Sequence, residues 1–168
     1  MKLYIVANRL PVKAVPRQDS YTFVRSEGGL ATGLDSLQIS MEKHWIGWPG
    51  VCVDNARQQI EIRQHLETMD FHPIFLSEEQ YHDYYEGYSN STIWPLCHYF
   101  FSHTTVRKEY WESYQKVNAL FCEEICKQVD SGDWVWIQDY QLMLLPGMLR
   151  KRMPNLHIGY FHHIPFPS

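Results

Sequence analysis

The feature that most constrains the fold is an alternation of short apolar runs with segments of helical periodicity. Leu3–Ala7 is a continuous apolar run, which is typical of a parallel strand covered on both faces. Four further strands are predicted at 45–48, 71–76, 134–137 and 158–161, the last of them buried. Helices are predicted at 30–43, 56–69, 77–85 and 106–129, with another that ends at 150–152. This order indicates a doubly wound α/β domain with a mostly parallel sheet.

Local signals set several of these boundaries. Ser77-Glu78-Glu79-Gln80 has the pattern of a capping box, so a helix is predicted to begin there. Trp94-Pro95 is expected to break the segment that follows. The helix at 106–129 carries aromatic and aliphatic residues at three- and four-residue steps, which indicates one buried face.

Composition excludes several classes of function. A chain of 168 residues has room for one domain with a proper core. Its net charge is −4 and its basic residues are scattered, which argues against a nucleic-acid partner. The four cysteines form no CxxC pair, so we interpret them as reduced thiols of a cytoplasmic protein. No run is long enough to span a bilayer, and the amino-terminal apolar run is too short for a signal peptide.

The chain stops directly after the predicted strand at 158–161, on a segment with two histidines and two prolines. We interpret this ending as a cut, and the chain as one functional half of a larger protein. Aromatic residues make up 15% of the sequence, with six tryptophans and eleven tyrosines. Such rings suit carbohydrate binding, because a flat ring covers the apolar face of a sugar; the alternative is an aromatic-rich core.

Polar residues follow three predicted strands at their carboxyl ends, where open α/β sheets bind ligands. Arg9 follows the first strand, and its planar guanidinium suits a phosphate or carboxylate; the alternative is a surface salt bridge. Asp139 follows the strand at 134–137 and is suited to binding sugar hydroxyls or to capping the next helix. His163 follows the last strand, where the alternative is a structural histidine. Their convergence on one edge predicts a ligand site.

Two other segments are candidates for binding. Gly28-Gly29 precedes a predicted helix, so its free backbone N–H groups suit a phosphate, although tight turns explain most such pairs. The segment is not a GxGxxG fingerprint and no Walker lysine follows, which disfavours dinucleotide and simple ATP binding. The segment 84–90 gathers rings and small polar groups without helical periodicity; the alternative is core packing.

Taken together, the motifs resemble one family. In order, they are Asn8-Arg9-Leu10-Pro11, Glu27-Gly28-Gly29-Leu30, Trp45-Ile46-Gly47-Trp48, Tyr85 with Ser89-Asn90, Trp94-Pro95, Val117-Asn118, Asp139-Tyr140 and His163-Ile164-Pro165-Phe166-Pro167. This series is similar to the amino-terminal half of the trehalose-6-phosphate synthases, which are retaining glycosyltransferases. The resemblance covers the whole chain. It implies a Rossmann-like domain, the N-terminal half of a GT-B type glycosyltransferase, here residues 1–168, with the nucleotide-sugar-binding second domain absent.

The resemblance implies transfer of glucose from UDP-glucose to glucose-6-phosphate. The implied acceptor-binding residues are Arg9, Trp48, Tyr85, Trp94, Asp139 and Ile164. Of these, Arg9 and Tyr85 would hold the acceptor's phosphate, and Asp139 its sugar hydroxyls. Trp94 and Ile164 would shape the acceptor pocket.

For the donor, the resemblance implies backbone contacts from Gly28 and Gly29 to the diphosphate. His163 would contact the donor glucose near the reacting carbon, so His163 and Asp139 are the implied catalytic residues. No metal and no cofactor are implied, which agrees with the lack of a carboxylate pair at metal spacing. The implied partners are the nucleotide sugar, glucose-6-phosphate, the chain's own second domain and a homo-oligomer, without nucleic acid or membrane.

The sequence departs from the family pattern beside Asp139. Histidines commonly flank the Asp-Tyr pair, whereas here the flanking residues are Gln138 and Gln141, which lack a titratable ring. The basic residues that neutralise the donor diphosphate belong to the family's second half, so residues 1–168 are not expected to catalyse transfer alone. Three alternatives remain open: a synthase with another phosphorylated acceptor, such as glycerol phosphate; a non-catalytic subunit that binds sugar phosphate and regulates a partner; and a synthase fused to a downstream phosphatase domain.

Overall fold

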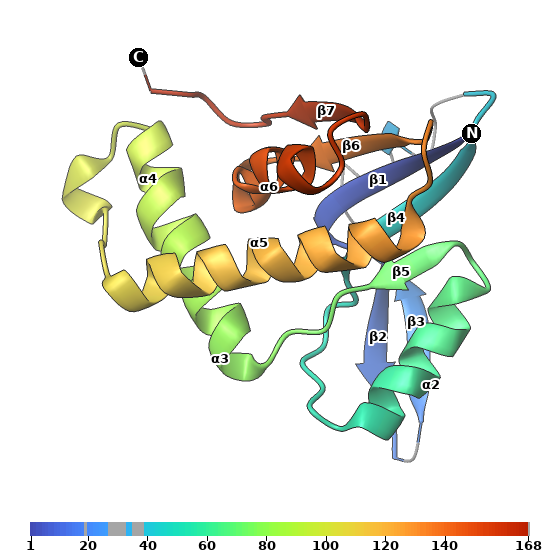
Figure 1. Ribbon diagram of the computed structural model, residues 1–168. Coiled ribbons are helices and arrows are strands. Elements are labelled where there is room, and N and C mark those ends of the chain that lie inside the picture. The colour runs from blue at the N-terminus through green and yellow to red at the C-terminus, as the bar shows by residue number, and fades with distance from the viewer. Residues whose placement is uncertain (19, 27–32, 35–38, 168) are drawn as a thin grey trace.

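A five-stranded parallel sheet forms the centre of the molecule (Figure 1). The computed structural model describes residues 1–18, 20–26, 33–34 and 39–167. The strands are β1 (Lys2–Arg9), β4 (Glu42–Trp48), β5 (Phe71–Pro73), β6 (Trp134–Gln138) and β7 (His157–Phe161). They lie in the order β5-β4-β1-β6-β7, so the direction of winding reverses between β1 and β6. The predicted doubly wound, Rossmann-like fold is therefore confirmed.

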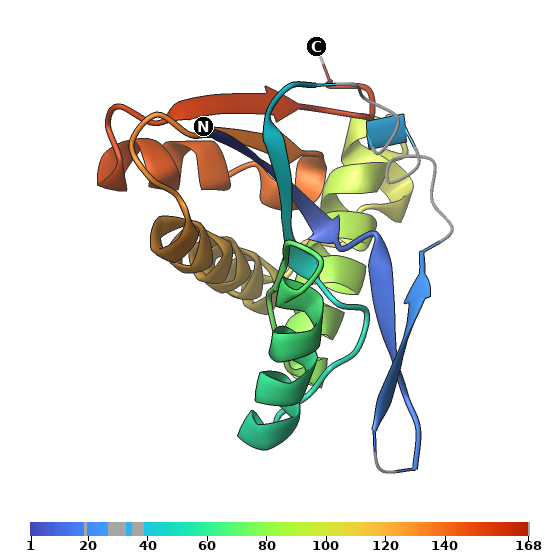
Figure 2. The ribbon, with the colours of Figure 1, turned by 90° about the vertical axis from the view of Figure 1, so that its right-hand side faces the viewer.

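Side chains alternate between the two faces of β1, so the sheet has a core on each side. On one face, Tyr4 and Val6 pack in a cluster with residues of α5 (Lys108–Gln128) and α6 (Leu145–Arg152). On the other face, Leu3 and Ile5 pack in a cluster with Ile62 of α2 (Ala56–Glu67). Figure 2 shows α5 and α6 on one side of the sheet. The predicted helices at 56–69 and 106–129 are confirmed as α2 and α5.

The segment after Ser77 is one continuous helical run with three geometries. It consists of α3 (Glu78–Gln80), a π-helix η1 (Tyr81–Ile93) and α4 (Trp94–Cys97). The predicted capping box is present, because Ser77 Oγ accepts from the backbone N–H of Gln80 while the Gln80 side chain accepts from the N–H of Ser77. The π-helix turn is wider than 3.6 residues, which explains the missing helical periodicity at 84–90.

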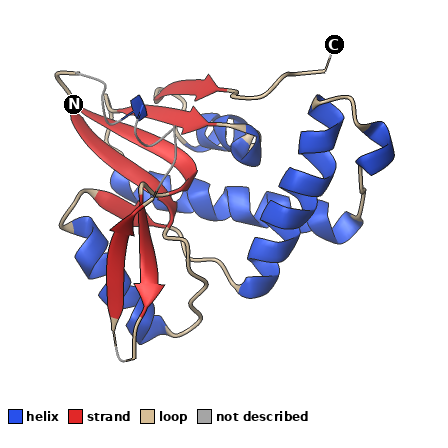
Figure 3. Cartoon of the chain, turned by 180° about the vertical axis from the view of Figure 1, so that it is seen from behind, coloured by secondary structure: helices blue, strands red, loops and turns tan. Residues whose placement is uncertain are grey.

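Trp94-Pro95 does not break this run, so that expectation is wrong. Pro95 lies where η1 passes into α4, and the carbonyl of Ser91, four residues before it, accepts instead from the N–H of Thr105 at 2.7 Å, so the missing proline N–H leaves this carbonyl paired. The run is followed by a short 3-10 turn, η2 (Phe101–His103), before α5 begins. Seen from behind in Figure 3, this helical run lies at the right, and the hairpin of β2 (Val12–Pro16) and β3 (Tyr21–Arg25) lies at the lower left.

The antiparallel hairpin of β2 (Val12–Pro16) and β3 (Tyr21–Arg25) was missed in the sequence. The hairpin follows β1 almost directly. At the junction, the Leu10 N–H donates a hydrogen bond to the Trp48 carbonyl at the end of β4. Phe23 stacks on His65 of α2, with ring centroids 3.9 Å apart. The hairpin thus extends the second core beyond the sheet.

Two boundaries and the burial of one strand also differ from the prediction. The helix expected to reach Lys43 ends earlier, since Glu42 and Lys43 already belong to β4; residues 33–34 are helical, and 30–32 and 35–38 lie outside the described residues. β5 is shorter than the predicted strand at 71–76. β7 is not buried: Tyr160 and Phe161 are 38% and 49% exposed, because β7 is an edge strand of the sheet. Within the described residues, no helix is long and apolar enough to cross a membrane.

Candidate functional site

The carboxyl ends of β1 and β6 meet at the point where the winding of the sheet reverses, which is where open α/β sheets bind ligands. A cavity of about 510 Å³ lies there. Its polar lining residues are Asn8, Arg9, Lys13, Arg25, Ser26, Gln138, Asp139 and Gln141. The structure therefore brings two residues predicted from separate strands, Arg9 and Asp139, to one cavity.

Aromatic rings bracket the guanidinium of Arg9. Its carbon Cζ lies 5.0 Å from the ring centroid of Trp48 and 5.2 Å from that of Tyr85. An Nη2–H group of Arg9 also donates a 3.4 Å hydrogen bond to the Tyr81 hydroxyl. Within the described part of the chain no carboxylate lies in ion-pair distance of Arg9, so the alternative of a surface salt bridge is not supported there. The remaining N–H groups stay available for an anion.

Tyr81 completes this bracket and was missed by the sequence analysis. Its ring lies 4.7 Å from that of Trp48 and 5.4 Å from that of Tyr85. Burial raises the pKa of Tyr81, while the neighbouring Arg9 lowers it. The net shift is upward, so the hydroxyl remains a neutral donor at physiological pH. A tyrosine four residues before Tyr85, in a capped helix, is the signal that could have identified it.

Gly47 fixes the position of Arg9 through the backbone. A Cβ atom at Gly47 would lie 2.7 Å from the Ala7 carbonyl oxygen and 3.0 Å from the Leu10 nitrogen. The end of β1 can approach β4 this closely only because residue 47 has no side chain. The pairing register shifts between Val6 and Arg9 at this same place, where β1 leaves the sheet and turns into the hairpin.

Asp139 adopts a backbone conformation that is rare for any residue but glycine, with φ 72° and ψ 173°. Such a conformation costs about 1–3 kcal/mol. Three hydrogen bonds hold it. The Asp139 N–H donates to the Phe161 carbonyl at 2.7 Å, and Oδ1 accepts from the N–H groups of Tyr140 (2.9 Å) and His163 (3.1 Å). Both carboxylate bonds use Oδ1, so Oδ2 has no partner within the described residues.

Asp139 thus also fulfils the capping alternative, since it precedes the short 3-10 turn η3 (Tyr140–Leu142). Its carboxylate also connects the end of β6 to the segment after β7, because it accepts the hydrogen bond from the His163 N–H. This second function places the backbone of His163 beside the Asp139 carboxylate.

Gln138 orients His163. The His163 Nε2 atom lies 2.9 Å from the Gln138 Oε1 atom, and the histidine ring packs on Phe161 at 4.6 Å. With the amide oxygen as acceptor, His163 carries its proton on Nε2 and keeps a lone pair on Nδ1. The glutamine that departs from the family pattern is therefore a positioning residue for a predicted site histidine.

The other predicted residues lie outside this cavity or outside the described chain. Trp94 is 38% exposed and stacks on His98, with ring centroids 4.0 Å apart. Ile164 packs at the margin of the core cluster formed with α5 and α6. Gly28 and Gly29 are not among the described residues. Lys13, on β2, lines the cavity with Arg9 and was not predicted, because the hairpin that positions it was missed.

The segment 84–90 contributes to core packing, which was one of the two readings that the sequence left open. Tyr84 is fully buried and donates a 3.0 Å hydrogen bond to the Asn8 side chain, which belongs to the cavity lining. Tyr140 donates in the same way to Asn90 at 3.0 Å. These two hydrogen bonds thus connect the π-helix to the ends of β1 and β6.

A reversing parallel sheet with a cationic, aromatic and polar carboxyl edge defines the class of Rossmann-like domains that bind anionic or sugar ligands. The model of glycosyltransferase family 20 matches residues 1–168, and the chain belongs to this family.

Named relatives agree with this assignment. The chain is 46% identical to the trehalose-6-phosphate synthase of Mycolicibacterium vanbaalenii, over 97% of this chain and 34% of the relative. It is 41% identical to the UDP-forming alpha,alpha-trehalose-phosphate synthase of Botryotinia fuckeliana, over 99% of this chain and 33% of the relative. The chain spans about a third of the length of these relatives.

Solved structures agree as well. A UDP-forming alpha,alpha-trehalose-phosphate synthase from Burkholderia xenovorans in complex with glucose-6-phosphate superposes with a TM-score of 0.75 and 26% identity, over 100% of this chain and 34% of that one. The E. coli protein bound with UDP-2-fluoro glucose superposes with a TM-score of 0.76 and 28% identity, over the same shares. The fold is thus that of the N-terminal half of a GT-B glycosyltransferase.

Proposed function

We propose that residues 1–168 form the acceptor-binding domain of a retaining, UDP-forming trehalose-6-phosphate synthase. The enzyme would transfer glucose from UDP-glucose to glucose-6-phosphate and form α,α-trehalose-6-phosphate. The observation that carries this proposal is the guanidinium of Arg9, held between Trp48 and Tyr85 with no carboxylate partner in the described residues. Such a group is suited to a phosphate, and a sugar-binding carboxylate, Asp139, lines the same cavity.

The geometry supports a division of roles. Arg9, with the hydroxyls of Tyr81 and Tyr85, would bind the acceptor's phosphate. The Oδ2 atom of Asp139, which has no partner among the described residues, would accept hydrogen bonds from acceptor hydroxyls. Trp48 would support Arg9 from behind, while Trp94 and Ile164 would shape the remainder of the acceptor pocket.

The donor side rests on fewer contacts. His163, with its proton held on Nε2 by Gln138, would contact the donor glucose near the reacting carbon. Gly28 and Gly29 would bind the donor diphosphate through their N–H groups.

No protein nucleophile is required in this proposal. The departing diphosphate oxygen takes the proton of the attacking acceptor hydroxyl on the same face of the sugar, so the chain's residues position both substrates and stabilise charge.

The proposal includes the chain's surroundings. A second domain, beyond these residues, would bind the nucleotide sugar and close the site; homo-oligomers would form from the whole protein. A cytoplasmic location is supported by the four free thiols, of which Cys97 and Cys122 are buried.

The decisive experiment measures UDP release by the full-length protein with UDP-glucose as donor. Release that depends on glucose-6-phosphate would support the proposed synthase. Release that depends on glycerol phosphate would keep the scaffold and change the acceptor. Tight binding of glucose-6-phosphate without release would favour the regulatory subunit.

A further inference from the structure

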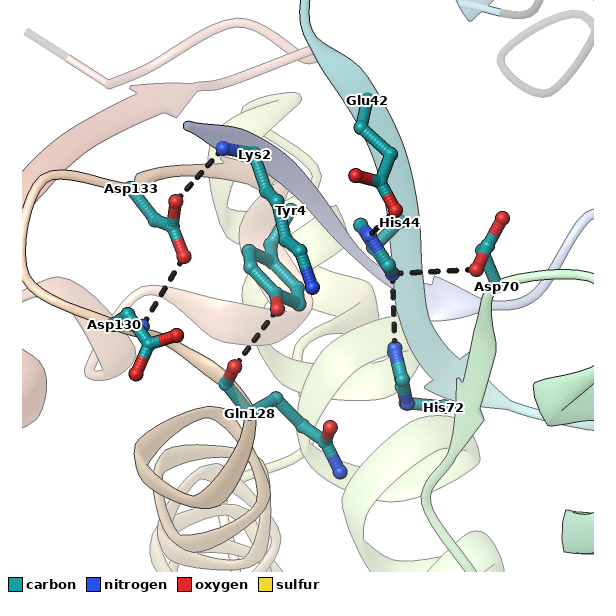
Figure 4. A network of polar contacts seen from close by, with 9 residues as sticks. All are labelled: Lys2, Tyr4, Glu42, His44, Asp70, His72, Gln128, Asp130 and Asp133. Carbon is teal, nitrogen blue, oxygen red and sulfur yellow. Dashed lines mark hydrogen bonds and ion pairs between the residues drawn. The ribbon is translucent and has the colours of Figure 1, made fainter.

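The opposite, amino-terminal edge of the sheet carries a second group of polar side chains (Figure 4). Two short sequences of the same pattern, a carboxylate two residues before a histidine, start neighbouring parallel strands. Glu42 and His44 belong to the start of β4, and Asp70 and His72 lie at the start of β5. Glu42 and His44 share a face of β4 because side chains two residues apart do so, and the side chains of Glu42, Asp70 and His72 all approach His44.

The distances around His44 are short. Its Nδ1 atom lies 3.3 Å from the His72 Nε2 atom and 3.8 Å from the Asp70 Oδ1 atom. Its Nε2 atom lies 3.0 Å from the Glu42 Oε1 atom. One potential metal-binding atom from each of Glu42, His44 and Asp70 can be chosen so that all three lie within 4.8 Å of one another. His44 is only 5% exposed and its ring stacks on Tyr4, so its orientation is fixed by packing.

Glu42 determines which His44 nitrogen is free. A carboxylate accepts the proton of Nε2–H, which leaves the Nδ1 lone pair facing His72 and Asp70. A histidine held from behind by a carboxylate is the usual arrangement of a metal ligand. The Nδ1 atom of His72 is buried and has no hydrogen-bond partner in the described chain, so the His72 ring is committed to the cluster only through Nε2.

We propose that His44 Nδ1, His72 Nε2 and the Asp70 carboxylate bind a zinc-class divalent cation, with Glu42 as the positioning residue behind His44. Two nitrogens bound to one tetrahedral zinc at about 2.0–2.1 Å lie about 3.3–3.4 Å apart, which is the separation seen here. Two imidazoles with a carboxylate suit zinc better than magnesium or calcium. The two carboxylates of the cluster balance the charge of a divalent cation.

The cluster needs one adjustment to close around an ion. The Asp70 side chain is 56% exposed, so it is free to turn toward the two histidines. The positive charge of Arg63 disfavours a cation beside His72, whereas the negative charges of Glu67 and Glu124 favour it.

The ion would have a structural function. It would join the start of β4 to the turn after α2 and the start of β5, at the end of β4 opposite to Trp48 and Arg9. Bound zinc would therefore stabilise the folded chain by mass action, without contact to the substrates.

The test is metal binding by the full-length protein. Equilibrium dialysis against zinc, followed by metal analysis, compares the wild type with His72→Asn and Glu42→Gln. Cobalt replaces zinc in a parallel measurement, because tetrahedral cobalt has intense visible absorption bands. We expect the wild type to bind one zinc more than His72→Asn, and Glu42→Gln to weaken binding about 10- to 100-fold. Zinc should raise the Tm of the wild type and leave the Tm of His72→Asn unchanged.

His103→Gln is the matched control, since His103 is an exposed histidine in η2 and should bind no zinc. Circular dichroism verifies that each variant is folded. If His72→Asn does not fold, the exposed Glu42→Gln variant decides by itself. Equal zinc content and equal cobalt spectra in wild type and variants would overturn the proposal, as would a wild type without zinc. Neither result would bear on UDP release.

Discussion

Arg9 shows what a single residue requires from the rest of the chain. Its place at the end of a strand could be predicted, because the apolar run before it is unmistakable. Trp48 and Tyr85 were implied beside it by the family resemblance, but Tyr81 was missed, because it belongs to a π-helix whose wide turn has no apolar periodicity at 3.6 residues. Lys13 was also missed, because the hairpin that carries it follows β1 with no turn signal that separates them.

Replacement of Arg9 by alanine should weaken use of the phosphorylated acceptor and leave donor binding nearly intact. A hydrogen bond to a charged group contributes about 1.5–3 kcal/mol, which corresponds to a ten- to hundred-fold change. The measurement is the dependence of UDP release on acceptor concentration in the full-length protein. Arg57→Ala, at an exposed position in α2, is the control; equal effects of both variants would contradict the phosphate assignment.

Asp139→Asn should separate the structural function of this residue from its chemical one. Asparagine retains an Oδ1 acceptor for the N–H groups of Tyr140 and His163 and tolerates positive φ. The Tm should therefore change little, while kcat/KM for the acceptor falls at least ten-fold because the charge is lost. A large loss of Tm with unchanged kcat/KM would show that Asp139 acts only as a cap.

At the scale of elements, regular periodicity made β1, α2 and α5 predictable, and contacts between elements decided the remainder. The strand at 158–161 is as apolar as a buried strand, yet it lies at the edge of the sheet, which its own sequence does not reveal. The helical run 77–97 continues through Pro95 because the Ser91 carbonyl, four residues before the proline, accepts a hydrogen bond from the Thr105 N–H instead. Its π-helix packs closely on α5 at Gly87.

Gly87→Ala should destabilise the protein by about 1–3 kcal/mol, since a Cβ atom would lie 2.7–2.9 Å from three carbons of the Tyr110 ring. Gly147→Ala in α6 is the matched control, because nothing lies within 4 Å of the added atom. That variant should be neutral or more stable by about 0.5–1 kcal/mol. Urea unfolding midpoints of the two variants give the comparison; equal midpoints would show that the π-helix adapts.

The molecule as a whole buries tyrosines on both the sheet and α5, which makes its stability sensitive to alkali. Burial raises the pKa of Tyr4 to about 12, and it also raises the pKa values of Tyr84 and Tyr114 above their usual range. In the unfolded chain these hydroxyls ionise near pH 10. The neutral form is therefore favoured by folding, so this contribution is complete below pH 10 and is lost as the pH rises above it.

The free energy of unfolding should thus fall above pH 10, by about 1.4 kcal/mol per pH unit for each such tyrosine. Urea unfolding at several pH values, with tyrosinate absorbance recorded, provides the measurement. Tyr4→Phe should lose stability at neutral pH, because its hydroxyl donates a 2.8 Å bond to the Gln128 carbonyl, but it should show a shallower alkaline decline. An unchanged slope would exclude Tyr4 from this effect.

The exposed strand β7 has a consequence for solubility during production of the protein. An edge strand offers unpaired N–H and C=O groups to any other strand, and aggregation begins from such pairing. β7 is kept to five residues, and Pro165 and Pro167 follow it closely in the sequence. Since proline donates no hydrogen bond, pairing of another strand with this edge cannot continue unbroken through Pro165 and Pro167. The two prolines thus limit how far along the chain such pairing extends, independently of any ligand.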